Sequence, residues 1–194
     1  TNISALAGIN ITPIQTWSTA VADFDNDGDM DIIITASSGA HNFFRNNLDT
    51  SNSVEEAYSN ITSGSGWDTN ASTNTDNIAY DFDNDGKVDV LGGGNKIMFN
   101  QGNNIFAPIT YTGLAVSAVG DLNNDGFKDI ITSTTGNNGR LGYYLNQTNA
   151  TFSAFNQIDE SLKQIFYLLL NDKKEFYSFF LFLFFLTKYI DINK

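Results

Sequence analysis

Three short acidic segments carry the residues of this sequence that are best suited to chemistry. They read DFDNDGDMD from Asp23 to Asp31, DFDNDGKVD from Asp81 to Asp89, and DLNNDGFKD from Asp121 to Asp129. Oxygen side chains at alternate positions of a tight loop can surround one hard cation, and Ca²⁺ takes about six to eight oxygen ligands in flexible geometry. The segments therefore predict about three calcium sites.

Positions 6 and 7 of each segment indicate how the loop turns around the ion. Position 6 is always glycine, which adopts a positive φ without strain at a sharp turn. Position 7 varies in chemistry, which favours a ligand role for its backbone carbonyl. The predicted ligands are the side chains of Asp23, Asp25, Asp27, Asp31, Asp81, Asp83, Asp85, Asp89, Asp121, Asn123, Asp125 and Asp129, and the carbonyls of Asp29, Lys87 and Phe127.

Two other interpretations of these segments compete with this one. An EF-hand loop ends in a bidentate Glu at position 12 and lies between helices, whereas position 12 here is Ile34, Gly92 or Thr132. The ninth-position Asp must then close each loop. A plain turn is the other interpretation, because Asp, Asn and Gly favour turns without any ion. Without bound ions, the carboxylates at positions 1, 5 and 9 of the three segments would repel one another with nothing to offset the repulsion. The matched pattern therefore favours bound cations over plain turns.

The negative charge of the chain is concentrated in these segments. The formal net charge is −12, and the three segments carry −5, −3 and −2 of it. The ten Lys and Arg residues are scattered, with only Lys173 and Lys174 adjacent, so no basic stripe is available to contact phosphates. Nucleic acid is therefore an unexpected partner. The absence of cysteine excludes disulfides, thiolate metal sites and cysteine nucleophiles.

The acidic segments belong to a longer internal repeat. Sixteen-residue stretches align from Ala20, Ile78 and Ala118, at spacings of 58 and 40 residues, and each is followed by an aromatic or apolar run that ends in Asn. The second spacing is close to the period of about 40 to 45 residues of one propeller blade. The excess in the first spacing lies in the polar stretch 49–76, which we interpret as a loop insertion.

Short apolar runs separated by turn residues predict about four strands per repeat and an all-β fold. We expect residues 1–159 to form a partial β-propeller of about three four-stranded blades. Residues 1–17 would complete a preceding blade, and residues 151–158 would contribute a strand after the third acidic loop.

Residues 160–194 form a Phe- and Leu-rich tail of different composition. All sixteen glycines lie at or before Gly142, and the longest charge-free stretch of the tail is Phe176–Thr187. That stretch is much shorter than the roughly 20 residues of a membrane-spanning helix, so membrane association is not expected from it. A membrane anchor, a packed amphipathic segment and translated non-coding or frame-shifted sequence stay open, and the last is favoured.

The repeated pattern resembles a known family. An apolar residue, the acidic loop, a β-branched run and an aromatic run ending in Asn resemble the FG-GAP/VCBS repeat over roughly residues 20–152. The resemblance implies blades like those of integrin α-subunits and many secreted bacterial proteins, with calcium held in a loop between adjacent strands. Leu122 and Asn123 depart from the pattern in the third loop.

No catalytic site can be assembled from this sequence, and we expect no enzyme. His41 is the single histidine and is interpreted as an exposed residue at the end of a strand. The run Gly92–Lys96 lacks the spacing and the ending of a phosphate-binding loop. Carboxylates committed to Ca²⁺ are poor proton donors, which argues against a glycosidase pair.

Binding functions remain. The first is an extracellular or cell-surface scaffold for protein interaction or adhesion, with further blades of the parent chain beside it. The second is a lectin-like propeller, with Trp17, Trp67, Tyr143 and Tyr144 available to stack on sugars, although packing is the favoured role for these aromatic residues. The third is a non-catalytic propeller attached to a secreted enzyme.

Overall fold

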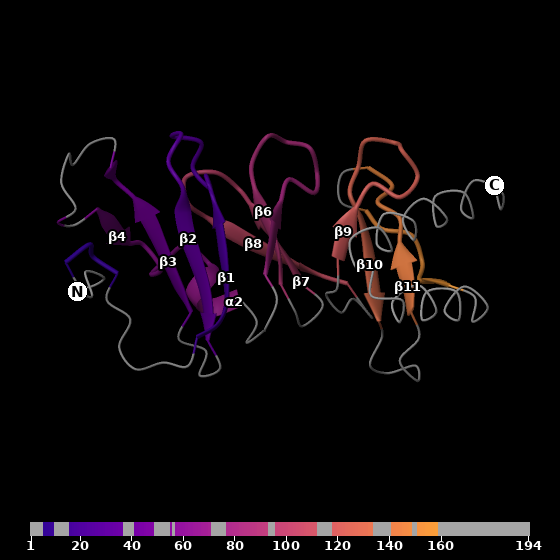
Figure 1. The fold of residues 1–194 in the computed structure, drawn as a ribbon, viewed down its shortest axis with the longest axis horizontal. Helices are drawn as coiled ribbons and strands as arrows, with labels where there is room; N and C mark the ends of the chain where they lie inside the picture. Colours follow the sequence, from indigo (N-terminus) through magenta and orange to yellow (C-terminus); the bar gives the residue numbers. More distant parts are fainter. Residues whose placement is uncertain are drawn as a thin grey trace, which may run out of the picture. The chain divides into compact units, whose positions relative to one another are not determined.

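A computed structural model describes residues 6–9, 16–36, 41–48, 55, 57–70, 77–92, 96–111, 118–133, 141–148 and 151–158. The Phe-rich tail of the sequence lies outside these residues. The described part is all-β, with three four-stranded antiparallel sheets (Figure 1). This architecture confirms the predicted partial β-propeller. The chain divides into two compact units, Thr1–Val116 and Ser117–Lys194.

Each sheet is an up-and-down meander in which strands that follow one another along the chain are hydrogen-bonded neighbours. The first contains β1 (Thr16–Ala22), β2 (Asp31–Ala36), β3 (Asn42–Asn46) and β4 (Tyr58–Asn60). The second contains β5 (Ile78–Tyr80), β6 (Asp89–Gly92), β7 (Lys96–Asn100) and β8 (Phe106–Thr110). The third contains β9 (Ala118–Gly120), β10 (Asp129–Ser133), β11 (Leu141–Tyr144) and β12 (Asn156–Gln157).

The strands follow from local sequence. β2 reads DIIITA and β10 reads DIITS, and such β-branched runs suit a pleated, buried surface. Ile33 of β2 pairs with Ala20 on β1 and with Phe43 on β3, so the three side chains share one buried face. Val21 lies on the opposite face and is 56% exposed. Ala20 and Val21 therefore show which face of β1 enters the core, whereas β2 is buried on both faces, with Ile34 only 5% exposed.

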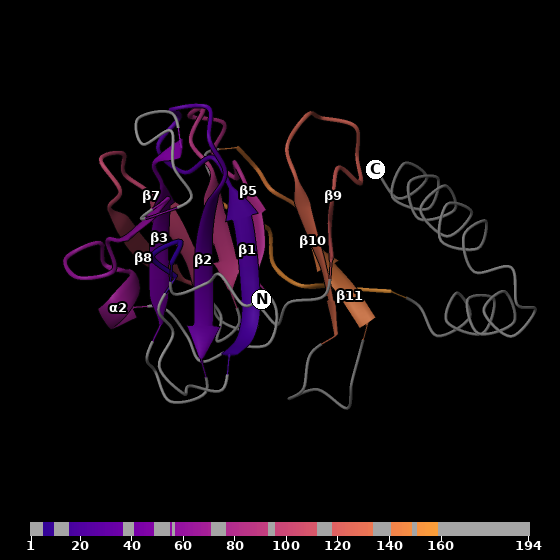
Figure 2. The ribbon, with the colours of Figure 1, turned by 60° about the vertical axis from the view of Figure 1, so that its left-hand side comes forward.

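The first and second sheets share one hydrophobic core, and the second sheet lies behind the first in Figure 2. Phe24, Phe43 and Phe106 meet edge to face, with ring centroids 5.7 to 5.8 Å apart. Edge-to-face contacts of this kind add about 0.5–1.5 kcal/mol per pair beyond the area they bury. The core residues are Ala20, Phe24, Ile33, Phe43, Trp67, Val90, Met98 and Phe106. The third sheet builds a separate cluster from Leu122, Ile131, Tyr143 and Ile158.

The stretch 49–76 is more than a loop insertion, so that interpretation was wrong. It supplies β4, the fourth strand of the first sheet, and a single helical turn, α2 (Trp67–Asn70). Trp67 is 1% exposed, and its indole Nε1 donates to the carbonyl of Ile34 at 3.2 Å. The indole ring also contacts Phe106 of the second sheet. The segment therefore joins two sheets through a buried side chain.

Two further expectations are corrected, and one is confirmed. Thr16 and Trp17 belong to β1 of the first sheet rather than to a preceding blade. His41 is buried, and its Nδ1 accepts a hydrogen bond from the amide of Ala36 at 3.2 Å, so it packs inside the β2–β3 connection. The strand expected within residues 151–158 is β12. Among the described residues, no helix has the length and apolarity needed to cross a membrane.

Candidate metal centres in the acidic loops

Each acidic segment connects the first two strands of its sheet, as Figure 1 shows for β1 and β2. The first strand ends immediately before position 1 of the loop, and the second strand starts with the Asp at position 9. The same arrangement recurs between β5 and β6 and between β9 and β10. The sheet therefore holds both ends of every loop in place.

The loops turn through two residues in the left-handed region. Position 6 has φ values of 98°, 85° and 92° at Gly28, Gly86 and Gly126, which confirms the need for glycine there. A Cβ at these glycines would contact nothing within 4 Å, so backbone conformation rather than crowding selects glycine.

Position 4 is also left-handed, with φ values of 61°, 57° and 61° at Asn26, Asn84 and Asn124. Sequence reasoning missed this role. The signal was present, because Asn occupies position 4 in all three loops and is among the residues that tolerate this conformation best.

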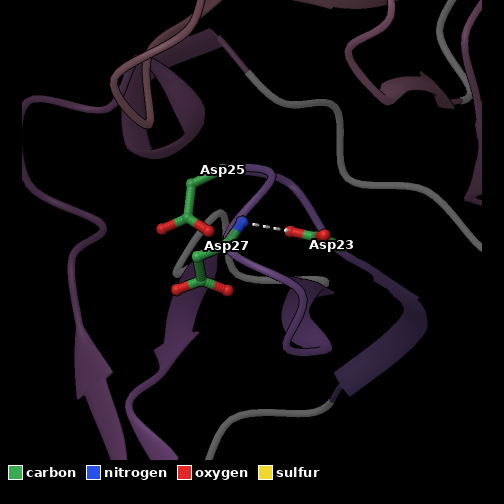
Figure 3. Close-up of side chains that lie close together, drawn as sticks. All are labelled: Asp23, Asp25 and Asp27. Atoms are coloured by element: carbon green, nitrogen blue, oxygen red, sulfur yellow. Dashed lines mark hydrogen bonds between the residues drawn. The ribbon is translucent and has the colours of Figure 1, made fainter. Parts of the chain in front are cut away.

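The first and fifth carboxylates organise the turn by accepting backbone amides. In the first loop, Asp23 accepts from the amide of Asp27 at 3.1 Å (Figure 3) and from the amide of Gly28 at 3.0 Å. The amide at position 7 donates to the position 5 carboxylate at 2.9 Å in every loop. Asp81 and Asp121 repeat the contacts of Asp23. The acidic side chains therefore stabilise the geometry of each turn.

The ninth-position Asp is buried and caps two separate backbone amides. In the second loop, the carboxylate oxygens of Asp89 accept from Phe82 at 2.9 Å and from Asn100 at 2.9 Å. Asp31 and Asp129 make the equivalent pairs of hydrogen bonds. Burial raises the pKa of Asp89 to about 7, and raises the pKa of Asp31 and of Asp129 to about 6. These residues fix the loop ends through hydrogen bonds, and their predicted role of closing each loop as ion ligands stays a prediction.

Carboxylate oxygens gather in the first two loops. One oxygen from each of Asp23, Asp25 and Asp27 lies within 4.8 Å of the others, and Asp81, Asp83 and Asp89 form a second such group. Figure 3 shows the first group around its turn. The Oδ1 atom of Asp25 is buried and has no hydrogen-bond partner. A buried acceptor without a donor, beside two other carboxylates, fits a bound hard cation.

Burial and neighbouring like charges both disfavour the ionised form of carboxylates in these two groups. Burial, followed by the charge of Asp27, raises the pKa of Asp25. Burial, followed by the charge of Asp85, raises the pKa of Asp83. Burial acts on Asp85 in the same direction, but hydrogen bonds and charge from Lys87 lower its pKa overall. Lys87 forms an ion pair with Asp85, so the second loop carries part of its own neutralisation.

The third loop is organised differently from the other two. Within the described part of the chain, groups of three clustered carboxylates occur only in the first and second loops. At position 3, the Nδ2 of Asn123 donates to Oδ2 of Asp125 at 2.8 Å, and its Oδ1 accepts from the amide of Asp125 at 3.2 Å. The amide side chain therefore occupies part of the carboxylate surface that would face an ion.

The aromatic residues considered for sugar stacking serve mainly as packing. Trp67, Tyr143 and Tyr144 are 1%, 9% and 6% exposed, which confirms the packing interpretation for these three. Trp17 differs, because 45% of its surface is exposed on β1.

Comparison with known families identifies the repeat. Residues 16–48 match the FG-GAP repeat, and residues 81–132 match the FG-GAP-like repeat. Together these matches cover all three acidic loops. No curated protein matches the chain. FG-GAP repeats are β-propeller modules typical of extracellular proteins and generally mediate protein interactions. Within a chain of three antiparallel four-stranded sheets, each carrying an acidic loop between its first two strands, residues 16–48 and 81–132 are repeats of the FG-GAP family.

Proposed function

We propose that this chain is a calcium-stabilised, extracellular scaffold for protein interaction or adhesion. The observation that carries the proposal is the buried, unpartnered Oδ1 of Asp25 within the group of three carboxylates in the first loop. Calcium there would be held by Asp23, Asp25 and Asp27, and in the second loop by Asp81, Asp83 and Asp89. In the third loop, Asp121, Asn123, Asp125 and Asp129 would supply a site with fewer charges.

Calcium suits these loops better than magnesium. The predicted ligands of each loop combine side-chain oxygens with one backbone carbonyl oxygen, and Ca²⁺ accepts such irregular sets of oxygens. Magnesium demands near-octahedral geometry and releases its water reluctantly. An ion would offset the desolvation cost of burying the charges of Asp25 and Asp83, and the repulsion from neighbouring carboxylates, both of which raise their pKa values. It would also fix the loops that project from the strands, which is the property a binding surface requires.

The proposed role is binding without catalysis. The acidic side chains already organise their own turns and would be engaged by calcium, so they are poorly placed to transfer protons. A protein partner is favoured over a glycan, because three of the four aromatic residues suited to sugar stacking are buried.

Thermal unfolding in excess chelator, in millimolar calcium and in millimolar magnesium tests the proposal. We expect calcium to raise the melting temperature clearly and magnesium to raise it less, since a ligand that binds only the folded state stabilises it by mass action. Equilibrium dialysis should give about three bound ions per chain at saturation. Identical melting curves in chelator and calcium would sink the calcium assignment.

A further inference from the structure

Two hydrogen bonds connect the acidic loop of the first sheet with the second sheet. The side-chain Nδ2 of Asn26 donates to the carbonyl of Gly86 at 3.2 Å. The side-chain Nδ2 of Asn100 donates to the carbonyl of Phe24 at 2.7 Å. All four residues belong to the first compact unit. The first two candidate sites are therefore bridged directly.

The Asn26 bridge joins the turning points of both loops. Asn26 stands between Asp25 and Asp27, and its left-handed backbone sets the direction of both neighbouring carboxylates. Gly86 donates its amide to Asp81 at 2.8 Å and immediately precedes Lys87, whose carbonyl is a predicted ligand. In the structure the bridge forms with both turns in these conformations.

The Asn100 bridge joins the two capping aspartates. The amide of Asn100 donates to Asp89 at 2.9 Å, while its side chain donates to Phe24. The amide of Phe24 in turn donates to Asp31 at 3.0 Å. Asn100 is 2% exposed, so this path is shielded from water and its loss would leave a buried carbonyl without its donor.

Asn46 shows what the same position does without a bridge. It ends β3 as Asn100 ends β7, and its amide caps Asp31 at 2.8 Å. Its Nδ2 donates to the carbonyl of Met30 at 3.2 Å within its own loop, just as the Nδ2 of Asn100 also donates to the carbonyl of Val88 at 3.2 Å. The contact of Asn100 with the neighbouring loop is therefore an addition to the shared capping role.

We propose that Asn26 and Asn100 are positioning residues that couple the first two calcium sites, so that filling either site tightens the other. The inference rests on the proposed calcium function. An ion in the second loop would fix Gly86 and Asp89, and the two bridges would then order Asn26 and Phe24 in the first loop. The first loop then loses less conformational freedom on binding, and linkage makes the effect reciprocal. A coupling of about three- to tenfold in affinity corresponds to one net hydrogen bond.

The coupling is measured by calorimetric calcium titration in a background that silences the third loop through Asp121→Asn and Asp125→Asn. Asp23→Asn with Asp25→Asn leaves only the second loop, and Asp81→Asn with Asp83→Asn leaves only the first. The product of the two stepwise association constants with both loops intact should exceed the product of the two single-loop constants by about three- to tenfold.

Asn26→Gly removes one bridge while keeping the left-handed turn, and it should reduce this ratio toward one. The matched control is Asn84→Gly at the same position of the second loop, where φ is 57°, and it should leave the ratio unchanged. Asn100→Ala should also lower the ratio, whereas Asn46→Ala should weaken the first site without lowering it.

The outcomes separate the two proposals. If the two sites bind calcium independently while Asn26 and Asn100 are both present, or if Asn26→Gly leaves the ratio unchanged, the coupling is overturned while calcium binding stays intact. If the protein without any substitution binds no calcium, the proposed function is overturned, and the coupling with it.

Discussion

The backbone amide of Asn46 donates to Oδ1 of Asp31 at 2.8 Å, which ties the last residue of β3 to the first residue of β2. The other oxygen of Asp31 accepts from Phe24 in the loop. One buried carboxylate thus holds a loop and two strands together, before any ion is considered. The same construction at Asp89 and Asp129 makes it a property of the repeat.

The first prediction concerns this cap. Asp31→Ala should lower the free energy of unfolding by about 2–5 kcal/mol, because it leaves two buried amide donors unsatisfied at about 1–3 kcal/mol each. Urea denaturation in excess chelator measures the cap apart from calcium. Asp29→Ala is the control, since that side chain is not a predicted ligand or cap, and it should cost less than about 1 kcal/mol. Equal losses in the two variants would contradict the capping role.

The second prediction is a pH dependence that calcium reverses. The folded-state pKa values of Asp31, Asp89 and Asp129 are raised by burial to about 6, 7 and 6. In this range the folded state binds more protons than the unfolded state, so stability without calcium should fall as pH rises from about 4 to about 7. Calcium binds the ionised carboxylates, so its stabilising effect should grow over the same range.

Melting temperatures measured across this pH range, in chelator and in calcium, check the second prediction. Asp89→Asn should flatten the chelator profile between pH 5 and 7, because it removes the group with the highest raised pKa. A stability without calcium that rises over this interval would show that the three buried aspartates do not dominate the pH response.

The third prediction orders the sites. The third loop should bind calcium most weakly, because Asn123 supplies a neutral oxygen and its amide engages Asp125. Ligand charge is one determinant of calcium affinity. Asn123→Asp should tighten the third site severalfold in a calorimetric titration of protein with the first two loops silenced. If calcium fills the unsubstituted third loop before the other two loops, the proposed order of affinities is wrong.

The fourth prediction separates the two tryptophans. Trp67→Ala should destabilise the first unit by about 3–5 kcal/mol, because it opens a large cavity and removes the hydrogen bond to Ile34. Trp17→Ala removes a side chain that is 45% exposed and should change stability by less than about 1 kcal/mol. Urea denaturation followed by far-ultraviolet circular dichroism measures both. Comparable effects would show that the segment after β4 is not part of the core.

The repeat and its turns could be predicted because their causes are local. Glycine at position 6 and the β-branched run after position 9 both act over a few residues. Trp67 was predicted to pack, but its segment was not, because a polar surrounding sequence conceals one aromatic residue that enters a distant core. The burial of His41 was missed for a similar reason. Its partner, Ala36, offers only a backbone amide, which no side-chain pattern marks.

The bridges of the candidate site were the least predictable feature. Asn100 contacts Phe24 across 76 residues in addition to Val88 of its own loop, and the longer contact depends on how two sheets pack. Asn46 has the same sequence context and donates within its own loop. Sequence alone could indicate a capping Asn at the end of each third strand, but not which one reaches across.

The capping aspartates also have a consequence for the order of events during synthesis. Asp31 is satisfied by partners 7 and 15 residues away, and Asp89 by partners 7 and 11 residues away. Short-range contacts form early and at low entropic cost, so each repeat can close its cap soon after its own third strand leaves the ribosome. The 76-residue contact of Asn100 must wait for the next repeat. Vectorial translation therefore completes a cap before the neighbouring sheet arrives, which limits the time that a buried carboxylate spends without its donors.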